Sequence, residues 1–318
     1  MKATQGTTYR MLGSRLDDIT RQLEDLRTIG ATGKKLNKPS DDPSAIRPVL
    51  STRKQISNVD RYLETMHSSL DTMESTDSYL EHVENIMQRA KEIAVNAGNG
   101  ALNSDDLASL GDELKNLREE LADTANGQIN DKYLFAGFND DTIPFVENTA
   151  FDPALYDRND PTTWPYTYQG DNNHIYQEIS PGEQIQTNLT GAELFIGDAD
   201  MDGNVDSDKV DLFAVLALTE DAVRSGDTTA LQTQIDQLDT AAEQNRRLRS
   251  QMGNRASRVD EAIMHQEQVK IDLKQILSRY EDADAIESFT AITEQETAYE
   301  AALSITGKVS KLSILDYM

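Results

Sequence analysis

The chain contains no cysteine among its 318 residues, so disulfide bonds, thiolate metal sites and thiol nucleophiles are all excluded. It has no apolar run that approaches the ~20 residues of a membrane-spanning helix. Residues 1–15 also lack the apolar stretch of a signal peptide. These absences alone predict a cytoplasmic protein, unless a dedicated machine exports the chain by a different signal.

Basic residues are few: the sequence has 30 lysines and arginines against 56 acidic residues, a formal net charge of -26. Such a surface repels phosphate backbones and anionic membranes. We therefore expect neither nucleic acid nor a membrane among the partners. The same charge keeps monomers soluble and apart, which suits a protein that must not assemble too early.

Patterns typical of catalysis are also scarce. There is no nucleophile elbow, and residues 32–35 (Thr-Gly-Lys-Lys) lack the first glycine and the preceding strand of a phosphate-binding loop. We interpret that segment as a basic turn between two helices. The sequence predicts no enzyme and, apart from a calcium loop considered below, no cofactor. No metal-ligand spacing relates the four histidines, His67, His82, His174 and His265.

What the sequence does have is helical periodicity at both ends. Apolar residues alternate spacings of three and four, which places them on one stripe of a helix that packs on another helix. Such stripes can form an ordinary intramolecular core, but at chain ends they favour packing between subunits. The positions that we expect at an assembly interface are Tyr9, Leu12, Leu16, Ile19, Leu23 and Leu26, together with Ala302, Ile305, Val309 and Leu312.

Capping residues mark further helices between these ends. Asp42 is a typical N-cap before Pro43, which suits the first helical position, and a helix should run from there to about Ala97. Ser104 is the expected cap of the next helix, and the short connection predicts an antiparallel hairpin with an intramolecular core. Helix should resume near Lys209, because proline is absent after residue 181.

The middle of the chain has the short alternating segments of β structure. Strands are expected at residues 166–168, 174–179 and 184–190, bounded by turn residues. Residues 139–165 are rich in Asp, Asn, Pro and Thr, which predicts a long loop or insertion.

We therefore predict a mainly α fold with a β-rich insert, in which the N- and C-terminal arms form a long helical coiled coil or bundle. The chain goes out, turns through the β domain and returns. The expected parts are an N-terminal assembly arm (1–42), a helical hairpin (43–131), a β-rich outer domain (132–208), returning rod helices (209–265) and a C-terminal assembly arm (266–318).

One acidic loop resembles the calcium-binding loop of an EF-hand. Glycine stands at loop position six, where that loop turns sharply, but Lys209 occupies position twelve, where a bidentate glutamate is required. A weak calcium site and a solvated acidic loop both remain open. The ligands would be Asp198, Asp200, Asp202, Asn204 and Asp206, at positions one, three, five, seven and nine.

Several motifs, in order, resemble the bacterial flagellin family and, within it, the branch that joins hook to filament. They cover the chain up to about residue 138 and from about residue 212 onward. The similar segments are residues 32–37 (Thr-Gly-Lys-Lys-Leu-Asn), 39–43 (Pro-Ser-Asp-Asp-Pro), 97–100 (Ala-Gly-Asn-Gly), 125–137, 294–303 and 312–317.

The resemblance implies a non-enzymatic structural subunit of the extracellular flagellum. Its implied partners are hook-associated protein 1, flagellin and further copies of itself. It also implies export by the flagellar type III apparatus, with an export chaperone and without a cleaved signal peptide. Two alternatives remain at this stage: a flagellin of the filament itself, or an extracellular binding or adhesin module.

Overall fold

The computed structural model describes residues 2–99 and 102–315, with side chains at residue 7 and at residues 10–99 and 102–308. The chain divides into two compact units. Unit 1 is built from the residues up to 60 and from 267 onward, and unit 2 from residues 61–266. Both units are mainly helical, because the long helices α2 (Pro43–Gly98) and α5 (Thr228–Glu281) contribute to each of them.

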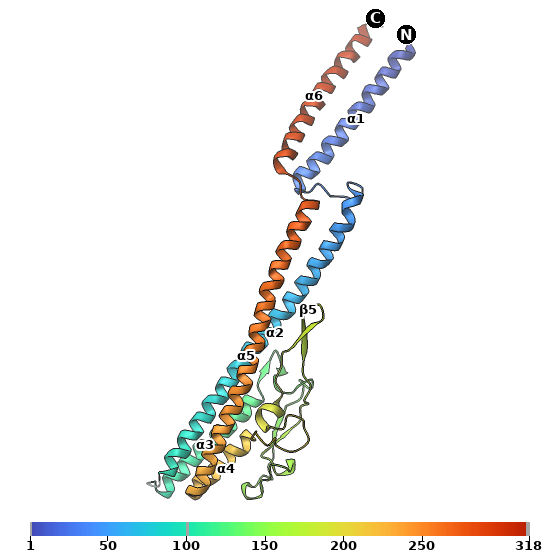
Figure 1. Ribbon diagram of the computed structural model, residues 1–318. Helices are drawn as coiled ribbons and strands as arrows, with labels where there is room; N and C mark the ends of the chain where they lie inside the picture. Colours follow the sequence, from blue (N-terminus) through green and yellow to red (C-terminus); the bar gives the residue numbers. More distant parts are fainter. Residues whose placement is uncertain (1, 100–101, 316–318) are drawn as a thin grey trace. The chain divides into compact units, whose positions relative to one another are not determined.

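Long helices dominate the described part of the chain (Figure 1). The predicted fold class, mainly α with a β-rich insert, is confirmed. The helices are α1 (Lys2–Thr32), α2 (Pro43–Gly98), α3 (Ser104–Ala125), α4 (Leu212–Ser225), α5 (Thr228–Glu281) and α6 (Ala285–Leu315). None of the helices described is both long and apolar enough to cross a membrane.

Polar caps explain where several helices begin. The Asp42 carboxylate accepts the backbone N–H groups of Ser44 and Ala45, so α2 begins at Pro43 as predicted. The prediction that Ser104 caps α3 was wrong. Asn103 is the cap, and it forms a capping box with Asp106 because each side chain bonds the other's backbone N–H.

In unit 2 the helices pack antiparallel, and polar side-chain pairs between the helices mark their register. The pairs His82–Glu120 and Arg89–Glu113 join α2 to α3, which confirms the predicted hairpin. Two further pairs, Arg249–Asp77 and Arg246–Glu84, join α5 to α2. On the far side of the hairpin, α4 packs on α3 through Arg224 and Asp112.

The β-rich region consists of three separate two-stranded antiparallel sheets. Strand β4 lies where the sequence predicted it, but the interpretation of residues 139–165 as loop was incomplete. Phe145–Glu147 within that segment pairs with β4, register Val146 to Thr167. The strands are β1 (Gln128–Ile129), β2 (Lys132–Tyr133), β3 (Phe145–Glu147), β4 (Tyr166–Tyr168), β5 (Tyr176–Ser180) and β6 (Glu183–Gln186).

An aromatic cluster joins the β3–β4 sheet to helix α4. The Phe135, Phe145, Phe195 and Phe213 side chains are buried, and their ring centroids lie 5.2–5.8 Å apart in successive contacts. Such aromatic contacts add to the free energy of apolar burial. The Gln244 side chain of α5 also donates to the Leu194 carbonyl, so the β-rich region is tied directly to the bundle.

Candidate assembly interface

Helices α1 and α6 lie side by side and run in opposite directions (Figure 1). Arg27 Nη2 lies 2.8 Å from Glu296 Oε1, and Gln295 donates to the side chain of Gln22. The two backbones approach closely at Gly30, where an added Cβ would lie 2.9 Å from Cδ1 of Ile292. The N-terminal stripe therefore has a partner within the same chain.

The predicted interface residues differ in their surroundings. Leu23 is buried, and Ile305 is exposed over 53% of its surface. Leu12, Leu16, Ile19, Leu26 and Ala302 are half-buried. The side chains of Tyr9, Val309 and Leu312 lie outside the described residues. Contact with other subunits at these positions stays a prediction.

Apolar residues that the periodicity did not identify lie exposed at the start of α6. Ile286 is 80% exposed and Phe289 is 61% exposed, while Ile292 of the same helix contacts α1. Leu303 is also exposed, over 46% of its surface. Helix α6 therefore has apolar side chains that contact α1 and others that face solvent. This pattern is typical of a helix that packs against further helices on assembly.

Two connectors, the segment between α1 and α2 and the segment between α5 and α6, meet at Glu281. Its side chain is only 2% exposed, and its Oε1 accepts from both Lys34 and Arg53. Its backbone carbonyl accepts the Lys35 N–H, and Gly33 accepts the Ala283 N–H. The Thr-Gly-Lys-Lys segment is a basic turn between two helices, as interpreted from the sequence. Its contact with a carboxylate of the same chain was not predicted.

Reversing the charge at Glu281 should release these connectors. A lysine there would face Lys34 and Arg53, although both are about half-exposed and partly screened by solvent. We expect hydrogen exchange at the amides of Lys35 and Ala283 to accelerate about tenfold in Glu281→Lys. Glu287→Lys, an exposed carboxylate on α6, is the control, and equal exchange in both variants would remove any role for Glu281.

The acidic loop brings three of its five predicted ligands together. Carboxylate oxygens of Asp198, Asp200 and Asp202 lie within 4.8 Å of one another. Asp198 is buried, which raises the pKa of its carboxyl, and it accepts the backbone N–H groups of Asp202 and Gly203. Asp206, by contrast, forms an ion pair with Lys209, 2.9 Å away. Asn204 donates its backbone N–H to Asp202.

Calcium binding by this loop stays a prediction. Because the bidentate ligand is missing, we expect a dissociation constant of about 10⁻⁴ to 10⁻³ M. At ten times that concentration, calcium would add roughly 1.4 kcal/mol to the free energy of unfolding. A melting curve should therefore rise with calcium, not with magnesium, and Asp200→Ala but not Asp141→Ala should abolish the rise. Identical curves with calcium, magnesium and chelator would leave an acidic loop without a metal.

The terminal helices pair with each other and leave large apolar side chains exposed. This arrangement is typical of a structural subunit that packs against further helices. The model of the bacterial flagellin N-terminal helical region matches residues 7–140, and that of the C-terminal helical region matches residues 235–318. These two matches cover more than half of the chain, and the chain belongs to the bacterial flagellin family. It is a structural protein of the flagellum and not an enzyme.

Solved structures with the same fold include two hook-associated proteins. A putative flagellar hook-associated protein from Vibrio parahaemolyticus is 18% identical, with a TM-score of 0.64 over 76% of this chain and 100% of that one. Hook-associated protein 3 from Legionella pneumophila is 15% identical, with a TM-score of 0.58 over 73% of this chain and 97% of that one.

A third structure, FlgL of Xanthomonas campestris, is 16% identical, with a TM-score of 0.57 over 71% of this chain and 99% of that one. No curated protein sequence matches the chain significantly. These comparisons give no support to the alternative of an adhesin module.

Proposed function

We propose that this chain is the subunit that joins the hook to the filament, as a thin layer between hook-associated protein 1 and flagellin. Its neighbours in that layer would be further copies of itself. The similar structures named as hook-associated proteins support this role, since the chain spans nearly their whole length.

The observation that carries the proposal is the terminal helix pair. The α1–α6 pair buries Leu23 but leaves Ile286 and Phe289 in solvent. A subunit that lies between two different protein layers needs apolar helix surface for neighbours on more than one side, beyond what its own chain covers.

A deletion strain tests the role in the junction. Without this protein, hooks should remain intact while flagellin monomers appear in the culture medium, because the filament has nothing to build on. Expression of the intact chain should restore attached filaments. A deletion strain that still carries normal filaments would contradict the proposal.

The alternative within the family is flagellin itself, the repeating filament subunit. Copy number separates the two roles, since a junction layer holds few copies and a filament holds very many. Immunogold labelling should therefore mark only the base of each filament. Labelling along the whole filament would favour the flagellin alternative.

Export follows from the proposed role. The chain would leave the cell unfolded through the flagellar type III apparatus, accompanied by an export chaperone, and would act outside the cell. The absence of cysteine suits this passage, because no disulfide can lock the chain. Accumulation of the protein inside cells that lack a working export apparatus is the expected observation.

A further inference from the structure

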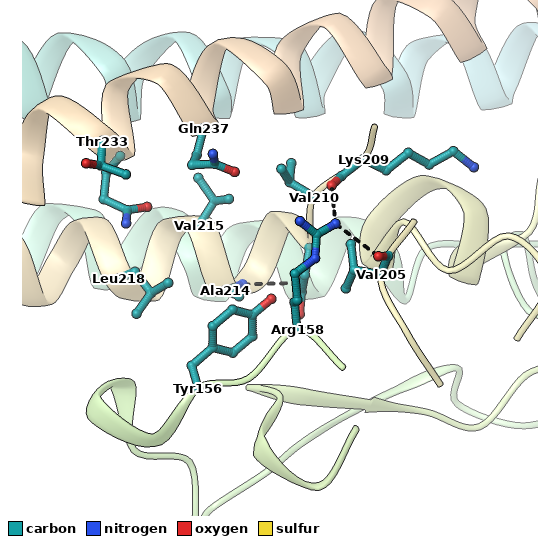
Figure 2. Close-up of a pocket in the computed structure, with 12 residues that line it drawn as sticks. Tyr156, Arg158, Val205, Lys209, Val210, Ala214, Val215, Leu218, Thr233 and Gln237 are labelled. Atoms are coloured by element: carbon teal, nitrogen blue, oxygen red, sulfur yellow. Dashed lines mark hydrogen bonds between the residues drawn. The ribbon is translucent and has the colours of Figure 1, made fainter. Parts of the chain in front are cut away.

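A small pocket opens in unit 2, between α4, α5 and the loop that follows β3 (Figure 2). Its volume is about 200 Å³. Most ligand pockets measure roughly 300–1,000 Å³. This pocket therefore suits one short side chain or a small molecule. Its walls are largely aliphatic, and Val210, Val215 and Leu218 contribute to them.

The cations at the edge of the pocket are already engaged. The Arg158 guanidinium donates to the backbone carbonyls of Val205, Asp206 and Lys209, as Figure 2 shows in part. The Lys209 ammonium forms an ion pair with Asp206, outside the pocket lining. Within the part of the chain that the structure describes, neither cation therefore forms an ion pair with a carboxylate of the pocket lining.

Hydrogen-bond acceptors inside the pocket have spare capacity. The Asp211 side chain is 2% exposed, and it caps α4 by accepting the N–H groups of Phe213 and Ala214 at one oxygen, Oδ1. A carboxylate offers about four acceptor sites, so capacity remains. Gln234 lines the same pocket, and its Oε1 is buried without a hydrogen-bond partner among the described residues. An unpaired buried acceptor such as Gln234 Oε1 is costly unless a donor reaches it.

We propose that this pocket binds an organic cation, an ammonium or guanidinium group on a short alkyl stem, with Asp211 and Gln234 as its acceptors. The aliphatic walls take the stem and the acceptors take the N–H donors. Tyr156, which lines the pocket (Figure 2), offers an aromatic ring to the cation. The same chemistry is carried by a lysine or arginine side chain of a neighbouring subunit and by a free polyamine.

The charge of the pocket makes binding depend on pH. Burial raises the pKa of Asp211 to about 7. The other charged or titratable groups that line the pocket are Tyr156, Arg158 and Lys209. Only the ionised carboxylate attracts a cation strongly. Affinity should therefore rise about tenfold from pH 6 to pH 8, as the ionised fraction of Asp211 increases.

Titration of the full chain with n-butylammonium chloride tests this proposal. The backbone amide resonances of Phe213 and Ala214 should shift in a saturable manner, while n-butanol, which has the stem without the charge, should leave them unchanged. Putrescine and Nα-acetyl-lysine methylamide, used as separate probes, distinguish a free polyamine from a protein side chain. Sodium chloride at matched ionic strength controls for screening.

Two variants test whether Asp211 and Gln234 bind the cation. Asp211→Asn keeps a capping residue but removes the charge, and it should weaken n-butylammonium binding at pH 8 at least tenfold, about the factor typical of a lost charged hydrogen bond. Gln234→Met should weaken it several-fold without touching the α4 cap. Asp221→Asn, an exposed carboxylate on the same helix, should bind normally. No saturable shift in the natural chain, equal shifts with butanol, or equal binding by all three variants would overturn the proposal.

Discussion

A chain that carries Leu16→Asp and Leu23→Asp should fail to attach filaments to hooks, while unit 2 still folds. Leu23 is buried and Leu16 half-buried on α1, the helix that packs against α6. Unpaired carboxylates in such a seam cost on the order of several kcal/mol. Unit 2 contains neither residue, so its aromatic cluster and bundle should be unaffected. The measurement is the number of attached filaments per cell in a deletion strain that expresses the variant.

The matched control adds the same two charges to the exposed side of the same helix. Ser14 and Thr28 are both exposed, so Ser14→Asp together with Thr28→Asp leaves the apolar stripe intact. This control should support normal filaments. The near-UV circular dichroism of Trp164, which lies in unit 2, should be the same in both variants. If the stripe variant attaches filaments as well as the control does, the terminal helices are not the assembly element.

Local signals in the sequence were enough to predict several helix boundaries. Asp42 with Pro43 marked the start of α2, and Gly33, with φ +68°, follows the last residue of α1. These signals act within one turn of the chain, so a pattern can capture them. The cap of α3 was misplaced by one residue because Asn103 and Ser104 are both good caps, and only the backbone geometry selects between them.

Long-range partners could not be predicted in the same way. Strand β3 is three residues long, between a proline and an asparagine, and it becomes a strand only because β4 pairs with it some twenty residues later. Glu281 likewise looks like any helix-terminal carboxylate until Lys34 and Arg53 meet it. The sequence therefore predicted the helical frame and the stripe of α1, but not the connectors that hold the terminal helices.

The candidate sites also differ in whether their residues are close together or far apart in the sequence. The acidic loop could be found because its residues are close in sequence, and three of its carboxylates do converge. The pocket beside α4 could not, since Tyr156, Asp211 and Gln234 are far apart along the chain. The exposed Phe289 gave no periodic signal, because its helix is apolar on more than one side.

Asp211 is the group whose ionisation should matter most for the stability of unit 2. Burial raises the pKa of its carboxyl from 3.8 to about 7, although the two backbone N–H groups that it accepts act in the opposite direction. The folded chain therefore binds this proton more tightly than the unfolded chain does. The resulting stabilisation is fully present below pH 3.8 and is lost as the pH rises through about 7.

We expect Asp211→Asn to remove this loss of stability at high pH. Asparagine is uncharged at every pH and still caps a helix, so the variant should match the natural chain most closely at low pH and be more stable at pH 8. The difference in free energy of unfolding between the two chains should change by about 2–3 kcal/mol from pH 5 to pH 8, given 1.36 kcal/mol per pKa unit. Urea unfolding at both pH values, followed by Trp164 fluorescence, measures this difference.

Asp221→Asn controls for the general effect of removing a carboxylate from this region. A difference in free energy of unfolding that stays constant with pH would show that Asp211 does not titrate in this range.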